Sequence, residues 1–232
     1  MAFKSLVLDI DGVLIRDKLL LEHVKDNCVS YVRSKLPECK DPGAVNRILY
    51  LSYGHTARGL THAFEIDTTD FNAKVYDKRL LEHLSEVIHG SDFQQEAQEV
   101  YDLRKNDWKI TLFSNSPFEW AGAVADAIGD EVAVRCPGAN LNQSPLKPEA
   151  SAFMHFPKHH THLFVDDSLK NLGTARWLPN WHPIHYTEGP KDAQTWCPQV
   201  SSIWDLCLYV NSVDQWMKDH HEAVSFSTRY KM

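Results

Sequence analysis

The chain has 232 residues, of which 43% are hydrophobic, so it can bury enough apolar surface to fold and is not a disordered protein. Its 24 lysines and arginines are outnumbered by 31 acidic residues, which gives a formal net charge of −7. We therefore expect no nucleic-acid polymer among its partners.

The first apolar segment, residues 6–14, contains Asp9 and Asp11. Carboxylates are costly in hydrocarbon, so this segment does not predict a membrane span, and it lacks the features of a secretory signal. The five cysteines are scattered and form no metal-binding or redox pair. We expect a cytoplasmic protein with no membrane partner.

Three short apolar runs, at residues 5–9, 109–113 and 162–165, predict buried strands, and each ends on polar residues. The later two are each followed by a helical pattern of apolar residues. Strand followed by helix, repeated, indicates parallel pairing and an α/β fold. We predict a Rossmann-like sheet with helices on both faces; with short strands near 132–134 and 184–186 it would hold about five strands.

Between Asp11 and the second strand lie too many residues for one crossover connection. Their apolar spacing is helical; one predicted face consists of Val45, Ile48, Leu49 and Ser52. The sequence thus predicts an inserted α-helical cap domain at 16–88 and a Rossmann-like core formed by 1–15 and 89–232. Apolar residues near 203–210 predict a terminal helix that packs on this core.

Ligands of open parallel sheets bind beyond the carboxyl ends of the strands, where we expect Asp9, Asp11, Ser114, Asp166 and Asp167. Two carboxylates at ~4 Å repel each other by about 4 kcal/mol at an effective dielectric constant of 20. A bound cation would relieve this repulsion. Because the candidate ligands are hard oxygens and no cysteines or histidines cluster beside them, we expect Mg²⁺.

Lys147 lies just before Pro148, which is well placed to begin a helix, so the lysine would stand near a positive helix end. Ser114 and the backbone N–H groups that follow it offer hydrogen-bond donors to the same anion. A cation, a lysine and amide donors together suit a phosphoryl group.

Four segments, in this order along the chain, resemble the four motifs of the haloacid dehalogenase-like superfamily. They are Asp9-Ile-Asp11-Gly-Val-Leu14, Phe113-Ser114-Asn115, Leu146-Lys147-Pro148 and Phe164-Val-Asp166-Asp167-Ser168 with Asn171-Leu172 after it. The resemblance implies a Rossmann-like core with a cap inserted after the first motif.

The resemblance also implies a mechanism. Asp9 would attack phosphorus and form an aspartyl-phosphate that water then hydrolyses. Asp11 would protonate the leaving oxygen and later activate the water. Ser114 and Lys147 would hold the phosphoryl group, and Asn115 would orient it through its backbone.

For the metal, the resemblance implies that Mg²⁺ is bound by Asp9, Asp167 and the backbone carbonyl of Asp11. Asp166 would bind the ion either directly or through water.

Within the predicted cap, Tyr53-Gly54 followed by Arg58-Gly59-Leu60 is similar to an element of the pyrimidine 5'-nucleotidase branch. Tyr53, His55 and Arg58 are therefore candidates for contact with the leaving group. The chain departs from that branch at Gly12, where asparagine is common.

The sequence predicts a Mg²⁺-dependent phosphomonoesterase acting on a small phosphorylated metabolite, with nucleoside 5'-monophosphates among the candidates. A phosphomutase or another phosphotransferase of the superfamily stays open, as does a catalytically idle binding protein with this fold. Asp11 disfavours a dehalogenase, which usually lacks this second acid. The order of the motifs disfavours a signalling receiver domain, whose paired acids follow the first strand. A homodimer also stays open.

Overall fold

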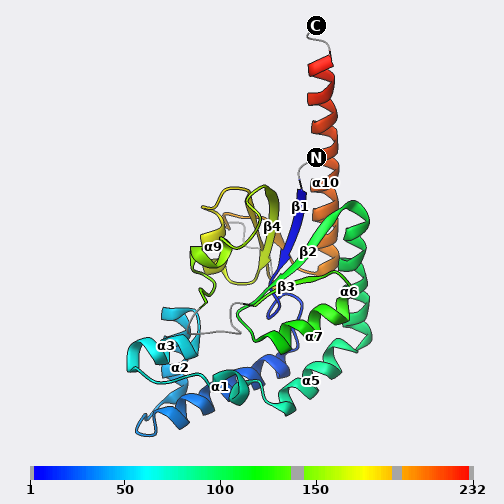
Figure 1. Cartoon of the computed structure of the whole chain (residues 1–232). Helices are drawn as coiled ribbons and strands as arrows, with labels where there is room; N and C mark the ends of the chain where they lie inside the picture. Colours follow the sequence, from blue (N-terminus) through cyan, green and yellow to red (C-terminus); the bar gives the residue numbers. More distant parts are fainter. Residues whose placement is uncertain (1–2, 137–143, 190–194, 230–232) are drawn as a thin grey trace.

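A parallel sheet forms the centre of the computed structural model, which describes residues 3–136, 144–189 and 195–229 (Figure 1). Within these residues six strands pair in the order β3-β2-β1-β4-β5-β6, all parallel. The strands are β1 (Phe3–Leu8), β2 (Trp108–Phe113), β3 (Ala133–Arg135), β4 (His160–Asp166), β5 (Trp181–Tyr186) and β6 (Gln199–Val200). The predicted α/β Rossmann-like fold is confirmed, with an edge strand, β6, that the sequence pattern did not indicate.

Helices α1 to α6 and the turn η1 lie between β1 and β2 in the chain, and the remaining helices follow β2. The helices are α1 (Lys18–Lys35), α2 (Pro42–Tyr53), α3 (Thr56–Phe64), α4 (Phe71–Val75), α5 (Lys78–Ile88), α6 (Ser91–Asp102), the 3₁₀ turn η1 (Leu103–Asn106), α7 (Phe118–Ile128), α8 (Ala150–Phe153), α9 (Leu169–Ala175) and α10 (Ile203–Arg229).

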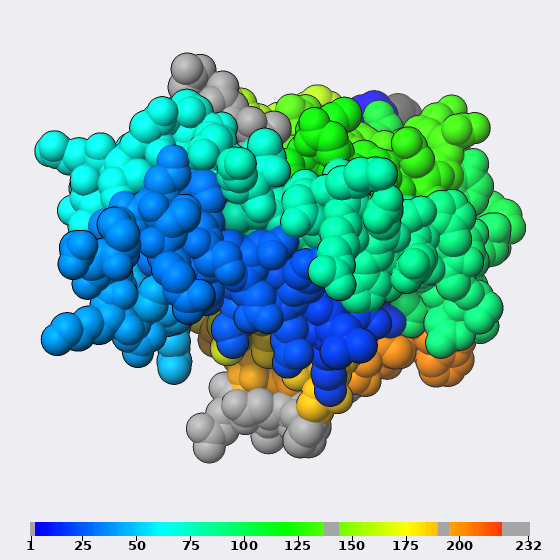
Figure 2. Space-filling model, turned by 90° about the horizontal axis from the view of Figure 1, so that it is seen from below, coloured from blue at the N-terminus to red at the C-terminus, as the bar shows by residue number. Residues whose placement is uncertain are grey.

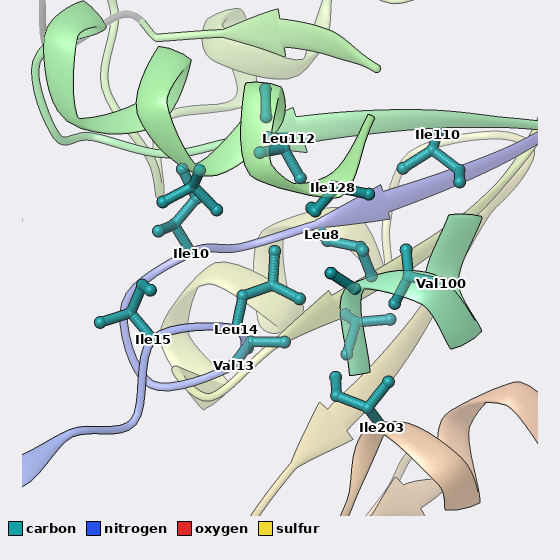
Figure 3. Close-up of a cluster of buried hydrophobic side chains, with 14 of the residues drawn as sticks. Leu8, Ile10, Val13, Leu14, Ile15, Val100, Ile110, Leu112, Ile128 and Ile203 are labelled. Atoms are coloured by element: carbon teal, nitrogen blue, oxygen red, sulfur yellow. The ribbon is translucent and has the colours of Figure 1, made fainter. Parts of the chain in front are cut away.

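Helices cover both faces of the sheet. Successive residues of a strand point to opposite faces, so a strand such as β1 contributes to two clusters. Leu6 and Leu8 of β1 join a cluster that includes residues of α6, α7 and α10. Figure 3 shows part of this cluster, with Val100 of α6 and Ile203 of α10. Val7 joins a second cluster with residues of α8 and α9 on the opposite face. A continuous apolar strand is therefore the expected sequence for β1.

Helices α1 to α4 pack on one another through their own cluster of buried side chains, separate from the sheet clusters. Figure 2 shows residues of the insertion spread over the end of the molecule that is seen from below. Helix α5 contributes Leu80 and Leu84 to the cluster that covers the sheet, and α1 contributes Leu20 to it. The boundaries of a cap domain at 16–88 stay a prediction.

The predicted apolar face of α2 is only partly buried. Ile48 is 61% exposed, whereas Leu49 and the polar Asn46 are buried. Asn46 can be buried because its side-chain oxygen accepts a hydrogen bond from Thr56, with the two oxygens 2.6 Å apart. In α10 the predicted face is buried through Ile203, Leu206 and Val210. Among the described helices, none combines the length and hydrophobicity that crossing a membrane requires.

Candidate active site

The polar residues that follow β1, β2 and β4 meet at one edge of the sheet. Asp9 follows β1, Ser114 follows β2, and Asp166 is the last residue of β4. Strand β1 pairs with both β2 and β4, so their carboxyl ends lie side by side. The backbone N–H of Asp9 donates to the carbonyl of Val165 at 2.9 Å, which fixes its position against β4.

Lys147 stands between two of these acids. Its Nζ lies 2.8 Å from Oδ1 of Asp9 and 2.8 Å from Oδ2 of Asp166. Asp166 is fully buried and also accepts hydrogen bonds from the backbone N–H of Ser168 at 2.8 Å and from Asn171 Nδ2 at 3.0 Å. The side chain of Lys147, which is 2% exposed, therefore links Asp9 after β1 to Asp166 at the end of β4.

The charges at this edge do not balance. Burial raises the pKa of Asp9 well above its usual value, and Lys147 only partly opposes this shift. Burial and the charge of Asp166 raise the pKa of Asp167 to about 6. Burial disfavours the charge of Lys147, but Asp166 and Asp9 outweigh burial, so the pKa of Lys147 is raised. One ammonium group faces three carboxylates, so a bound cation would stabilise the ionised acids.

The donor atoms fit such a cation. Carboxylate oxygens of Asp9, Asp166 and Asp167 lie within 4.8 Å of one another. Gly12 leaves room for Asp167, because a Cβ at Gly12 would lie 2.4 Å from Asp167 Oδ2, and its φ of 87° also favours glycine. Three hard oxygens suit Mg²⁺, and these three residues could hold it.

Asp11 has different surroundings from the other acids. Its Oδ2 accepts a hydrogen bond from Ser116 Oγ at 2.5 Å, and its Oδ1 accepts one from Trp120 Nε1 at 3.0 Å. Burial raises the pKa of Asp11, and these two donors and the charge of Lys147 offset only part of that effect. The carboxyl of Asp11 is not part of the acidic cluster, so a metal contact would have to use its backbone carbonyl.

Asn115 holds the loop that carries Lys147. Its Nδ2 donates to the backbone carbonyl of Lys147 at 2.9 Å, and its Oδ1 accepts from the backbone N–H of Lys147 at 3.0 Å. Ser114 is buried, and its Oγ accepts from the backbone N–H of Ser116 at 3.1 Å. The Asn115 side chain is thus occupied with positioning Lys147, while the predicted backbone contact with a phosphoryl group stays a prediction.

A cavity of about 770 Å³ opens beside these residues. Asp9, Asp11, Lys147 and Asp167 lie on its wall, and so does His55 of the insertion. Burial and the charge of Arg58 lower the pKa of His55 to about 4, so its imidazole is neutral near pH 7. Its Nδ1 accepts from the backbone N–H of Ala57 at 3.2 Å and caps α3.

Tyr53 and Arg58 are not among the described residues that line the cavity. Arg58 forms an ion pair with Glu149, and Tyr53 stacks on His62 with ring centroids 6.0 Å apart. The structure therefore brings His55 to the cavity, whereas Arg58 pairs with Glu149 of the core and Tyr53 packs on His62 within the insertion.

Sequence reasoning assigned no role to several residues of this site. Ser116 and Trp120 contact Asp11, and Asn171 contacts Asp166. Tyr50 of α2 lines the same cavity as Asp9 and Asp167. The sequence position of Asn171 could have indicated this contact. Asn171 stands three residues after Ser168, in the first turn of a helix that begins beside two acids.

No family model matches the chain, and no curated protein matches it. Solved structures do match in fold. An HAD phosphatase from Thermococcus onnurineus is 15% identical, with 88% of this chain and 95% of that chain covered and a TM-score of 0.55. CbbY from Rhodobacter sphaeroides in complex with phosphate is 14% identical, with coverages of 89% and 96% and a TM-score of 0.56.

A third match is an HAD hydrolase of family IA, variant 3, from Entamoeba histolytica, 14% identical, with coverages of 87% and 94% and a TM-score of 0.55. The L-2-haloacid dehalogenase RSc1362 matches with a TM-score of 0.50 and 14% identity over 91% of this chain and 100% of that chain. These likenesses concern the fold, and none of them singles out the pyrimidine 5'-nucleotidase branch. The chain has the Rossmann-like fold of the haloacid dehalogenase-like hydrolases.

Proposed function

We propose that the protein is a Mg²⁺-dependent phosphomonoesterase that hydrolyses small metabolites through an aspartyl-phosphate on Asp9. The observation that carries this proposal is the position of Lys147 Nζ, 2.8 Å from both Asp9 and Asp166, at the wall of a cavity that Asp11 and Asp167 also line. Lys147 and the three acids Asp9, Asp11 and Asp167 on one cavity wall offer a nucleophile, an acid–base group and charge compensation for a phosphoryl group.

Each residue would contribute a separate part of the reaction. Asp9 would use the oxygen that does not face Lys147 to attack phosphorus, and the phosphorus–oxygen bond to the leaving group would break. Asp11 would give its proton to that leaving oxygen, and then take a proton from the water that attacks the phosphoenzyme. Its raised pKa favours the protonated form that the first step requires.

Lys147 and the hydroxyl of Ser114 would neutralise and hold the oxygens of the transferring group. Mg²⁺, held by Asp9, Asp166 and Asp167, would supply further charge stabilisation for these oxygens. The cavity volume of about 770 Å³ suits a small molecule and not a polymer.

The test is phosphate release from a panel of small phosphomonoesters with Mg²⁺, with mass spectrometry of acid-quenched protein to detect phosphate on Asp9. We expect Asp9→Asn to abolish both phosphate release and the covalent adduct. Asp126→Asn is the matched control, because Asp126 is exposed and lies outside this cavity. Wild-type turnover in Asp9→Asn would refute the covalent mechanism, and phosphate transfer to a second substrate without release would identify a mutase.

A further inference from the structure

Helices α1 and α2 each present one face to the cavity. From α1 these are Leu21, Val24, Lys25 and Cys28, which follow the three- and four-residue spacing of one helix face. From α2 the lining includes Ala44, Arg47 and Tyr50, and Gly54, which caps this helix, follows at the same spacing. The wall formed by the insertion therefore has two basic residues, Lys25 and Arg47, on an otherwise largely apolar surface.

These two basic residues have no ion-pair partner within the described part of the chain. Other basic residues of the insertion do have an ion-pair partner in the core: Arg16 pairs with Glu96, and Arg58 pairs with Glu149. The acid on the same wall is Asp41, whose carboxylate caps α2 by accepting from the backbone N–H of Ala44 at 2.9 Å. In a chain with a net charge of −7, two unpaired cations beside one cavity are available to an anionic ligand.

The position of Arg47 along α2 separates it from the reacting centre. Gly54 ends this helix against the Lys147 loop, where a Cβ would lie 2.9 Å from the carbonyl oxygen of Lys147. Arg47 precedes Gly54 by seven residues, or roughly 10 Å along a helix axis at 1.5 Å per residue. Side chains on a helix lean toward its N-terminus, which places the Arg47 side chain still farther from Lys147.

Apolar and aromatic groups lie on the same cavity wall as these charges. Leu21, Val24 and Cys28 come from α1, while Phe71 begins α4 and Tyr76 follows it. A ligand that reaches from the acidic cluster to Arg47 would thus place an apolar or aromatic middle portion against these side chains.

We propose that Lys25 and Arg47 bind a second anionic group, a carboxylate or a second phosphate, on the body of the phosphomonoester, roughly 10 Å from the reacting phosphate by the helix rise. This inference rests on the proposed function and narrows its substrate class. A nucleoside 5'-monophosphate of adenine, guanine, cytosine or uracil carries no second anion on its base, so it would leave this subsite unused.

The test compares matched esters that differ in the second anion. Phenyl phosphate is paired with 4-(2-carboxyethyl)phenyl phosphate, and hexyl phosphate with hexane-1,6-diyl bisphosphate; the two pairs distinguish a carboxylate from a phosphate. For each pair the wild-type enzyme gives a ratio of kcat/KM, charged ester over uncharged ester. We expect Lys25→Gln and Arg47→Gln each to lower the ratio about tenfold in at least one pair, because each loses a charge-assisted contact.

Lys18→Gln and Arg33→Gln are the matched controls, since both residues are exposed on α1 and lie outside the cavity lining. Their ratios should equal the wild-type ratio. A ratio that stays unchanged in Lys25→Gln and Arg47→Gln in both pairs would overturn the proposal, including the case in which both esters of a pair lose activity equally. That case would mean that the two residues bind the reacting phosphate.

A binding measurement separates this proposal from the proposed function. Calorimetric titration of the Asp9→Asn protein with each ester, in the presence of Mg²⁺, should give tighter binding of the charged ester, and Arg47→Gln in that background should remove the difference. If the wild-type protein hydrolyses none of the esters, the proposed function fails while this titration still tests the subsite. Equal binding of both esters of each pair would refute the subsite.

Discussion

Replacing Lys147 by methionine should destabilise the fold by about 3–5 kcal/mol at pH 8, the usual cost of removing one partner from a buried ion pair. The substitution keeps much of the side-chain volume but leaves Asp9 and Asp166 without their shared counter-charge. Each N–O distance is 2.8 Å, and at an effective dielectric constant of 20 each pair is worth about 6 kcal/mol before desolvation is subtracted.

The loss should depend on pH in a defined direction. Burial already raises the pKa of Asp9, and Lys147 is the largest opposing influence, so its removal raises this pKa further. An acid whose pKa is higher in the folded state than in the unfolded state stabilises the fold when protonated, and this contribution is lost as pH rises through the folded-state pKa. The variant should therefore lose less stability at pH 5 than at pH 8.

Magnesium should offset part of the loss. An ion that binds only the folded state stabilises it by about 2.7 kcal/mol at one hundred times its Kd. Because the variant cluster carries one more net negative charge, the addition of Mg²⁺ should stabilise Lys147→Met more than it stabilises the wild-type protein.

Urea unfolding followed by tryptophan fluorescence measures these effects, at pH 5 and pH 8, with and without Mg²⁺. Lys158→Met, at an exposed lysine, is the control for loss of a positive charge. A loss below about 1 kcal/mol at pH 8, the range of an exposed ion pair, would show that Lys147 does not balance the buried acids. An equal loss at both pH values would contradict the assignment of the raised pKa to Asp9.

Three further substitutions test neighbouring parts of the site. Asp11→Asn should slow turnover by about 10²- to 10⁴-fold while Mg²⁺ affinity, measured by calorimetry, stays near the wild-type value, because the Asp11 carboxyl lies outside the acidic cluster. Asn115→Ala removes both hydrogen bonds to the Lys147 backbone and should cost about 1–3 kcal/mol in urea unfolding; a matched change at exposed Asn211 should cost far less. Gly12→Ala should weaken Mg²⁺ binding in the same calorimetric assay, because the new methyl group would overlap Asp167; unchanged affinity would argue against Asp167 as a ligand.

The sequence predicts the centre of this fold well, because its strands are short apolar runs that end on polar residues. The run at 109–113 lies within β2, and the run at 162–165 lies within β4. Strand β5 is longer than predicted, because Trp181 and His182 precede the apolar stretch and Pro183 interrupts the pattern. It nevertheless pairs with β4 on one side and β6 on the other, which supplies backbone hydrogen bonds whatever the side chains are.

Side-chain partners across the chain were less accessible to sequence reasoning. Ser116 and Trp120 meet Asp11 across more than one hundred residues, and no local spacing reveals such a contact. The apolar pattern of α2 predicts a buried Ile48, but Ile48 is exposed and Asn46 is buried. The Asn46 side-chain oxygen accepts a hydrogen bond from Thr56 of the next helix. Periodicity records which residues are apolar, but a buried polar residue depends on a partner that only the tertiary structure brings near.

The position of the insertion and the position of Lys147 depend on the same short loop. Leu146 is buried in the apolar cluster of α1 to α4, and the next residue, Lys147, is held on the core side by Asn115 and the two acids. Gly54 adopts a φ of 74° and lies too close to the Lys147 carbonyl to accept a side chain, while Arg58 reaches Glu149 just beyond the loop. A shift of the insertion that carried Leu146 with it would therefore pull Lys147 away from Asp9. Gly54 and Arg58 therefore couple the insertion to the Lys147 loop, although Arg58 is not among the described residues that line the cavity.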